Sequence, residues 1–293
     1  MARLRIGGVP EHFNLPWLLA IEEGELTSVH PDVQPEWTDF PGGTGAIMEA
    51  LDRGELDLAT PLTEGAVTAI TGGAAVRLVG FWVDSPLLWG IHVAGGSPAR
   101  GVDDLAGARF AISRLGSGSE LMSRMLAREH GWTLDDSRFV VVRDLDGALA
   151  ALPAGDAEVF LWNKSMTQPH VDAGTFARVG VIETPWPSFC VAVRADLARE
   201  QPKLVADVRA AACRRGRALM EDPTLAERVV QRYGLAAPEA TEWAAHVRWS
   251  DPSAETDTAA LREVCETMHA LGRVDRIADP AELLVRDDAR PRS

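Results

Sequence analysis

A proline between two apolar runs places the strongest constraint on the fold of this chain. The run Val76–Val83 is typical of a buried strand, and a second apolar run follows Pro86 and ends at Gly95-Gly96. Proline cannot donate a hydrogen bond to a sheet ladder, so one continuous central strand through Pro86 is not expected. We interpret the segment Asp84–Val93 as a crossover between two α/β lobes, with a ligand cleft between them.

Strands and helices alternate on both sides of this crossover. Alternation at this spacing predicts largely parallel sheets that are covered on both faces. The proline-bracketed segment Thr184-Pro185-Trp186-Pro187-Ser188 mirrors the first crossover, and from Asp196 onward the chain is expected to be helical. We therefore expect one lobe from residues 1–86 plus 190–293 and the other from residues 87–189. The expected strands are 4–9, 33–40, 56–59, 76–83, 109–112, 139–142, 157–162, 179–183 and 189–193.

The charge composition of the chain limits the kinds of partner that it can bind. The 293 residues carry a net charge of −14 and no stripe of Lys and Arg, which argues against nucleic acid and anionic membrane surfaces. A local pocket can still oppose the global charge, so an anionic small ligand remains possible.

The three cysteines are far apart, without C-x-x-C spacing, so we expect neither a disulfide framework nor a metal site. No apolar run is long enough to insert in a membrane, and the N-terminus leads directly into a strand without a signal-peptide pattern. A cytoplasmic location is therefore expected. A sequence trimmed and restarted at methionine would look the same and would be periplasmic or extracellular.

Several motifs resemble a known family. Residues 7–17 (GGVPEHFNLPW), Pro41–Gly45 (PGGTG), Leu62–Gly65 (LTEG) and Ser85–His92 (SPLLWGIH) look like the intracellular branch of the NMT1/THI5-like group, which also contains nitrate, sulfonate and taurine binding proteins. The turn Val102–Gly107 resembles the segment that opens the second lobe in that group. The likeness covers about residues 3 to 220. It implies a two-lobed, type II periplasmic-binding-protein-like fold and a solute-binding function.

The same fold group includes enzymes, which keeps an alternative open. One is a pyrimidine-precursor synthase that uses pyridoxal phosphate, and another is a sulfinate desulfinase with a cleft cysteine. The cysteine-rich motif of the first is absent here, and no cysteine matches the nucleophile of the second. No Ser-His-Asp pattern is visible either. These absences favour binding over catalysis, so we assign no catalytic residue and no cofactor.

Two glycine turns are the leading candidates for an anion site. Gly43 and Thr44 lie in one turn, and Ser117, Gly118 and Ser119 lie in the other, each between a strand and a helix. Free N–H groups at a helix start favour an anion, although both turns could simply be helix caps. One such turn in each lobe, at the carboxyl ends of strands, favours the ligand interpretation.

Aromatic and charged residues near strand ends complete the predicted site. Flat rings at Trp37, Trp162 and Trp186 could sandwich a ring-shaped ligand, while the alternative is that they belong to the core. His12 could donate to a ligand or cap the chain, and Glu64 could accept from a ligand amine or cap its helix. Arg114 and Lys164 could meet a carboxylate, sulfonate or phosphate, or could be solvated surface residues.

Three functions remain compatible with the sequence. The first is a solute-binding protein that closes two lobes on a small organic ligand, anionic or aromatic, with an ABC transporter as partner if the chain is exported. The second is an enzyme on the same scaffold, and the third is a cytoplasmic sensor or carrier. The ligand itself is not predicted.

Overall fold

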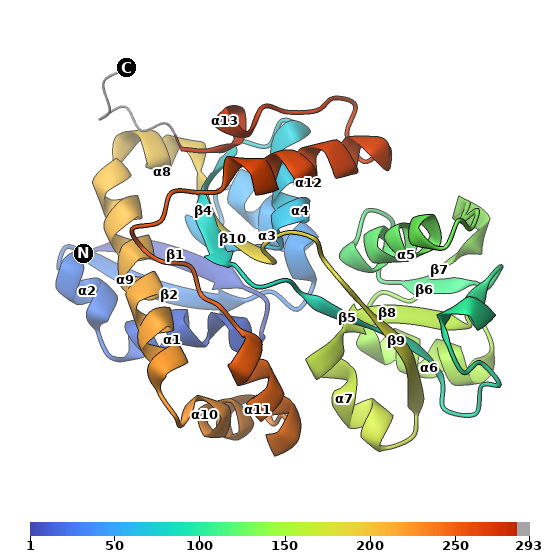
Figure 1. Cartoon of the computed structure of the whole chain (residues 1–293). Helices are drawn as coiled ribbons and strands as arrows, with labels where there is room; N and C mark the ends of the chain where they lie inside the picture. Colours follow the sequence, from blue (N-terminus) through green and yellow to red (C-terminus); the bar gives the residue numbers. More distant parts are fainter. Residues whose placement is uncertain (286–293) are drawn as a thin grey trace. The chain divides into compact units, whose positions relative to one another are not determined.

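The structure is a computed structural model, and it describes residues 1–285. It contains two five-stranded sheets, each accompanied by helices (Figure 1). Contacts within the chain define two compact units. The first unit contains Met1–Ser85, Trp186–Leu225 and the described residues from His246, and the second contains Pro86–Pro185 and Ala226–Ala245. The predicted two-lobed α/β class is confirmed.

The sheet of the first unit has the strand order β2-β1-β3-β10-β4. β1 pairs in parallel with β2 and β3, whereas β10 runs antiparallel to both β3 and β4. The sheet is therefore largely parallel, as predicted. β10 is the exception because the chain re-enters this sheet after it has built the second unit. The strands are β1 Ala2–Gly8, β2 Val33–Asp39, β3 Leu58–Thr60, β4 Val76–Val83 and β10 Phe189–Arg194.

Helices cover both faces of this sheet. The chain moves one way along the sheet from β1 to β2 and the other way from β2 to β3, so right-handed connections place α1 and α3 on opposite faces. α1 and α2 pack with α9, while α4 packs with α3, α12 and α13. The helices are η1 His12–Asn14, α1 Leu15–Glu22, α2 Glu25–Val29, α3 Gly43–Asp52, α4 Thr63–Thr71, α8 Ala195–Glu200, α9 Pro202–Glu221, α12 Thr258–Ala270 and α13 Pro280–Leu283.

Buried tryptophans form much of the core of the first unit. Trp17 and Trp82 lie with ring centroids 5.4 Å apart. The indole N–H groups of Trp82 and Trp249 both donate to the carbonyl of Phe13, at 3.2 and 2.9 Å. Gly216 makes room for Trp249, because a Cβ at that position would lie 2.7 Å from the Trp249 Cβ. These bonds fix the segment between β1 and α1, where the predicted site residue His12 lies.

The sheet of the second unit has the strand order β7-β6-β8-β5-β9. β6 pairs in parallel with β7 and β8, and β5 runs antiparallel to β8 and β9. The strands are β5 Leu88–Ala94, β6 Phe110–Ile112, β7 Phe139–Val141, β8 Val159–Asn163 and β9 Phe176–Glu183. The helices of this unit are η2 Val102–Leu105, α5 Gly118–Glu129, η3 Asp136–Arg138, α6 Leu145–Ala154, α7 Lys164–Asp172, α10 Leu225–Tyr233 and α11 Ala237–His246.

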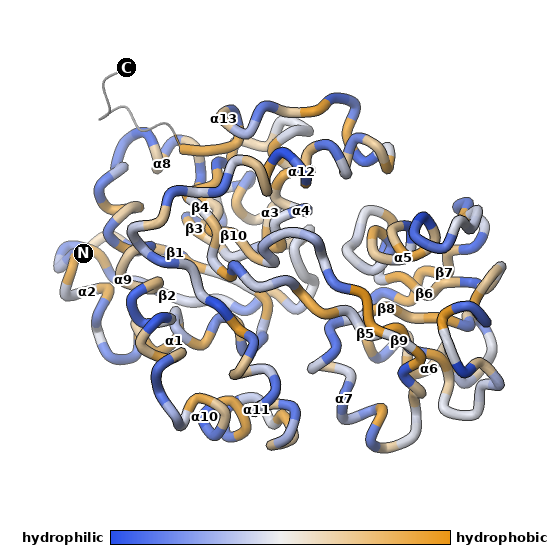
Figure 2. Tube along the Cα trace, viewed as in Figure 1, coloured by the Kyte–Doolittle hydropathy of each residue, from blue (hydrophilic) through white to orange (hydrophobic). Residues whose placement is uncertain are grey.

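An apolar core lies beneath α6 in the second unit, and Figure 2 shows the hydrophobic stretches of β5, β6 and β8 that contribute to it. His92 is buried beside this core. Its Nδ1 lies 3.2 Å from the Phe160 carbonyl, and its Nε2 lies 2.9 Å from the Thr167 hydroxyl. Burial lowers the pKa of His92 to about 4, so the ring is neutral near pH 7 and donates from Nδ1. His92 is thus a structural histidine.

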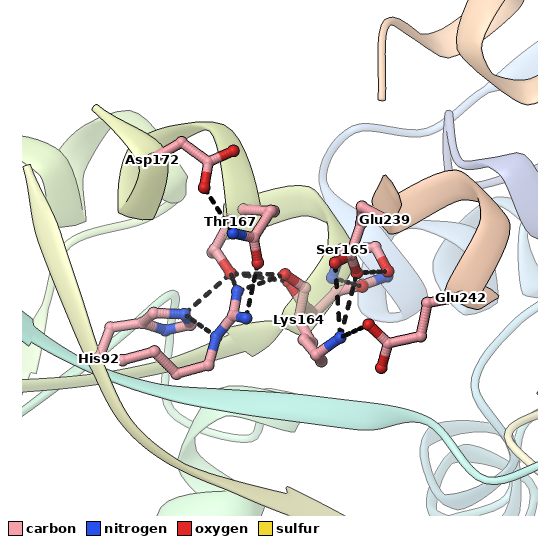
Figure 3. Close-up of polar contacts among 10 residues, drawn as sticks. His92, Lys164, Ser165, Thr167, Asp172, Glu239 and Glu242 are labelled. Atoms are coloured by element: carbon pink, nitrogen blue, oxygen red, sulfur yellow. Dashed lines mark hydrogen bonds and ion pairs between the residues drawn. The ribbon is translucent and has the colours of Figure 1, made fainter. Parts of the chain in front are cut away.

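A polar cluster joins α11 to α7 within the second unit (Figure 3). Lys164 at the start of α7 lies 2.9 Å from a carboxylate oxygen of Glu242 and 3.4 Å from Glu239, which also accepts from the Ser165 hydroxyl at 2.6 Å. These contacts explain why residues 226–245 group with the second unit, whereas the sequence assigned all of 190–293 to the first. Within residues 1–285, no helix combines the length and apolar character needed to cross a bilayer.

Candidate functional site

The carboxyl ends of the parallel strands are the expected place for a ligand in each sheet. In the first unit β1, β2, β3 and β4 point the same way, so the segments that follow them share one edge. The start of β10 lies at this same edge. Its backbone is tied to the turn after β3, because the amide of Thr63 donates to the Ser188 carbonyl at 3.0 Å and the amide of Cys190 donates to the Pro61 carbonyl at 3.1 Å.

This pairing brings two predicted site residues together. Glu64 lies in the first turn of α4, and its Oε2 accepts from the indole Nε1 of Trp186 at 3.0 Å. Both side chains are almost completely buried, with 3% of Glu64 and 2% of Trp186 exposed. The second carboxyl oxygen, Oε1, is also buried and has no hydrogen-bond partner among the described residues. The sequence had placed Trp186 and Glu64 in the site without indicating that they touch.

Burial changes the acidity of Glu64. Removing a carboxylate from water disfavours its charged form, and this effect raises the pKa of Glu64 to about 7. Hydrogen bonds from the Glu64 backbone and from Trp186 oppose the shift and are outweighed. Near neutral pH the group therefore exists in both protonation states.

The N-termini of α3 and α4 pack closely beside this pair. The hydroxyl of Thr44 accepts from the amide of Leu62 at 3.0 Å, and a Cβ on Gly65 would lie 2.3 Å from the Thr44 Cγ2. Gly65 is therefore required for the two helix starts to approach each other. Gly43 begins α3 with φ of +72°, a conformation that favours glycine. The PGGTG and LTEG motifs thus meet in space.

His12 and Trp37 lie near strand ends of the first unit, His12 after β1 and Trp37 near the end of β2. The His12 ring is fully buried and stacks on Phe13 with ring centroids 4.8 Å apart. Burial lowers the pKa of His12 to about 3, so it is neutral near pH 7. Trp37 is half-buried at the end of β2 and donates to the exposed Asp39 at 2.8 Å.

One polar pair at this edge was not predicted. The hydroxyl of Thr60 donates to Asn14 Oδ1 at 2.7 Å, and Asn14 Nδ2 donates to the Val9 carbonyl at 2.9 Å. Asn14 occupies the N-cap position of α1, but its side chain ties two strand ends together instead of capping the helix. Its place between a predicted strand and the Pro16 of the next helix was the available signal.

In the second unit the glycine-serine turn forms a compact hydroxyl cluster at the start of α5. Ser117 is the N-cap and accepts from the Glu120 amide at 3.4 Å, and its Oγ lies 3.0 Å from that of Ser119. The buried Glu120 carboxylate accepts from the Gly116 amide at 2.5 Å and from Arg124 at 2.8 Å. A carboxylate therefore already lies at the helix start where an anion was predicted, and Arg124 offsets its charge.

Of the other predicted residues of the second unit, only Arg114 lies at this turn. Its carbonyl accepts from the Ser117 amide at 3.2 Å, while its exposed side chain lies 3.5 Å from the Leu115 carbonyl. Trp162 stacks on Phe160 with centroids 5.2 Å apart and packs against the apolar core. Lys164 is paired with α11 (Figure 3). Within residues 1–285, neither Trp162 nor Lys164 forms a hydrogen bond or ion pair with the turn at Gly118.

Trp89 is a residue that the sequence did not single out as a site. It lies at the start of β5, paired with Asn163 at the carboxyl end of β8. Its side chain is buried, and its indole Nε1 has no hydrogen-bond partner within residues 1–285. A buried N–H group without an acceptor costs free energy, and an oxygen atom of a bound molecule would remove that cost.

Two features of the described residues bear on metal binding and catalysis: the arrangement of possible metal ligands and the thiol of Cys190. Among them no three His, Cys, Asp or Glu side chains gather closely enough to hold a metal ion. Cys190 is fully buried, and burial together with the negative charge of Glu64 raises the pKa of its thiol. A thiol in that environment stays protonated and is a poor nucleophile.

Comparison with solved structures identifies the fold. The chain superimposes on the CA3427 gene product of Candida albicans with a TM-score of 0.87, over 98% of this chain and 99% of that chain, at 23% identity. That protein is described as exhibiting the generic periplasmic binding protein structural fold. This chain has the fold of a periplasmic binding protein. Residues 89–182 also match the Ca3427-like PBP family.

Sulfonate-binding proteins are among the similar proteins. The alkanesulfonate-binding protein SsuA from Xanthomonas axonopodis pv. citri, bound to MOPS, aligns over 97% of this chain and 98% of its own, with a TM-score of 0.80 and 22% identity. A putative aliphatic sulfonates-binding protein of Escherichia coli is 29% identical over 161 residues. That match covers 55% of this chain and only about half (49%) of the other protein.

Proposed function

We propose that this chain is a solute-binding protein for a small organic anion, with sulfonates as the leading ligand class. The observation that carries the proposal is the end-to-end structural likeness to a sulfonate-binding protein that holds MOPS, itself an organic sulfonate. The sequence match to the aliphatic sulfonates-binding protein supports the same class.

The second unit supplies a donor that suits an anion. Trp89 Nε1 is a buried N–H group without a partner in the described chain, at the strand edge where ligands are expected. The hydroxyls of Ser117 and Ser119 lie in the turn after β6, whose carboxyl end points to the same edge as that of β8. Sulfonate oxygens are acceptors and would satisfy such donors.

Binding without chemical conversion fits the side chains better than catalysis. His12 is neutral and buried, the Cys190 thiol is protonated, and neither is paired with the other in the structure. An acid or base needs a poised pKa and a partner within hydrogen-bond reach of the reacting group. The pKa of Glu64 is near neutrality, but its side-chain partner is the indole of Trp186, which is neither an acid nor a base at that pH. An enzyme on this scaffold remains the alternative.

A cytoplasmic location and the intracellular branch of the family also belong to the proposal, and the sequence motifs are their support. If the chain is exported instead, we propose an ABC transporter as its partner, which the likeness to a protein of a putative sulfonate ABC transporter supports.

Calorimetric titration of the full chain with propane-1-sulfonate, butanoate, propylphosphonate and inorganic sulfate tests the ligand class. We expect propane-1-sulfonate to bind most tightly, with one site per chain. Trp89→Phe should weaken that binding by about tenfold, because phenylalanine keeps the aromatic bulk and removes the N–H donor, about 1.4 kcal/mol. Trp132→Phe, at a half-buried position in the same unit, is the matched control. Equal, weak heat from all four anions would contradict the proposal.

A further inference from the structure

Lys164 contacts two carboxylates of α11 that differ in their exposure to solvent (Figure 3). Its Nζ lies 3.4 Å from both carboxylate oxygens of Glu239 and 2.9 Å from Glu242 Oε2. The Glu239 side chain is 6% exposed, whereas that of Glu242 is 51% exposed. One ammonium group therefore meets one buried carboxylate and one that is also in contact with water.

The contact with Glu239 holds α11 against α7. Glu239 Oε1 also accepts from the Ser165 hydroxyl at 2.6 Å. Removal of the cation from a buried carboxylate is strongly destabilising, so this contact has to persist. The contact with Glu242 has no such requirement, because water can solvate a half-exposed carboxylate and ion pairs of that kind contribute little to stability.

Lys164 lies at the edge of the second sheet where the anion donors lie. It directly follows β8, and the residue before it, Asn163, pairs with Trp89. The turn with Ser117 and Ser119 follows β6, which runs parallel to β8 as its neighbour. These residues and α11 up to position 245 all belong to the second unit. The second unit therefore has a cation at the strand edge where an anionic ligand is expected.

An anionic ligand and Glu242 can use Lys164 in the same way. A sulfonate oxygen accepts a hydrogen bond from an ammonium group, as a carboxylate oxygen does. Two anions beside one another repel, so the ligand anion and the Glu242 carboxylate disfavour each other at the same Nζ. Departure of Glu242 costs little, because its carboxylate is already half in water.

We propose that Lys164 contacts the anionic group of the ligand and that Glu242 holds this position in the unliganded chain. Binding exchanges the Glu242 carboxylate for the ligand anion, while the contacts of Glu239 remain. This inference rests on the proposed function and adds to it a competitor that is part of the chain itself. Glu242 thereby lowers the affinity for the anion.

Calorimetric titration with propane-1-sulfonate tests the exchange on the full chain. The proteins are wild type, Glu242→Gln, Lys164→Gln and the variant with both substitutions. Glu227→Gln, at an exposed position of α10 in the same unit, is the matched control for the loss of one negative charge. Glutamine at position 164 keeps an N–H donor near Glu239, and circular dichroism shows whether each variant is folded.

We expect Glu242→Gln to bind propane-1-sulfonate about fivefold more tightly than wild type, a difference of about 1 kcal/mol. Glu227→Gln should bind as wild type does, and these three proteins decide the matter even where the Lys164 variants do not fold. Lys164→Gln should weaken binding at least tenfold, about 1.4 kcal/mol. With glutamine at position 164, Glu242→Gln should give no further gain, because both side chains act through one contact.

The contradicting outcomes are distinct. Binding to Glu242→Gln that is equal to or weaker than binding to wild type would overturn the inference and leave the proposed function standing. A gain that Glu227→Gln matches, or one of the same size with and without Lys164, would mean that Glu242 acts only as a distant charge, and it would also overturn the inference. No binding of propane-1-sulfonate to any of the proteins would overturn both the inference and the proposed function.

Discussion

Replacing Glu64 with glutamine should make the stability of the protein less dependent on pH. In the folded chain burial raises the pKa of Glu64 to about 7, from the ordinary value of 4.5. Between these two values the folded state keeps a proton that the unfolded state has lost. The free energy of unfolding therefore falls as the pH rises through this range, at up to 1.36 kcal/mol for each pH unit. By about pH 8 the burial of Glu64 has lowered the free energy of unfolding by about 3 kcal/mol.

Glutamine resembles the protonated carboxyl in shape and charge, and it preserves an acceptor for Trp186. The variant and wild type should thus have similar stability near about pH 4.5, within about 1 kcal/mol, and the variant should be more stable by up to about 3 kcal/mol near about pH 8. His12 and His92, whose pKa values are lowered, destabilise the folded state as the pH falls below 6.5, but they contribute equally to both proteins.

Urea unfolding followed by circular dichroism at a series of pH values measures this difference. Glu55→Gln, at an exposed site, controls for the loss of one carboxylate from the surface. A stability difference that stays constant with pH, or one in which wild type gains on the variant as the pH rises, would refute the assignment of Glu64 as a buried carboxyl with a raised pKa.

Two further substitutions test the second unit. Gly118→Pro should weaken binding of propane-1-sulfonate at least tenfold, about 1.4 kcal/mol, if the Gly118 amide contacts the anion. The helix should persist, because proline is tolerated at a first helical position and Ser117 already has the extended conformation that precedes proline (φ −84°, ψ 165°). Unchanged affinity in calorimetry would rule out a contact between the Gly118 amide and the anion. Lys164→Ala removes the ion-pair partner of the buried Glu239 carboxylate, and urea unfolding should show a loss of about 3 kcal/mol. The exposed Lys203→Ala should cost about 0–1 kcal/mol, and equal losses for both lysines would contradict the structural role of Lys164.

Local signals in the sequence predicted much of the architecture. The strand Val76–Val83 has the predicted bounds, because a run of apolar residues between a glycine-rich turn and Pro86 has few other folds available. α7 was not predicted, since its sequence is mostly polar and contains Pro169. Its N-cap Asn163, whose side chain accepts from the Ser165 amide at 3.0 Å, was the local signal that could have revealed it.

Long-range contacts set the limits of prediction for the site. The motif Leu62–Gly65 marked Glu64 as a candidate, but its partner Trp186 lies 122 positions away and is brought near by the pairing of the β3 turn with the start of β10. Lys164 was predicted to meet an anionic ligand, and the anions beside it are Glu239 and Glu242 from a helix 75 to 78 positions away. Spacing along the chain carries no information about such partners.

Native mass spectrometry of the full chain with 2-aminoethanesulfonate and propane-1-sulfonate tests the central claim most directly. The account predicts one adduct per chain with the mass of the intact sulfonate, and release of the same unaltered compound after long incubation. Absence of any sulfonate adduct at concentrations that saturate a micromolar site, about −8 kcal/mol, would contradict binding. Recovery of a chemically converted compound would show that the chain is an enzyme on this fold.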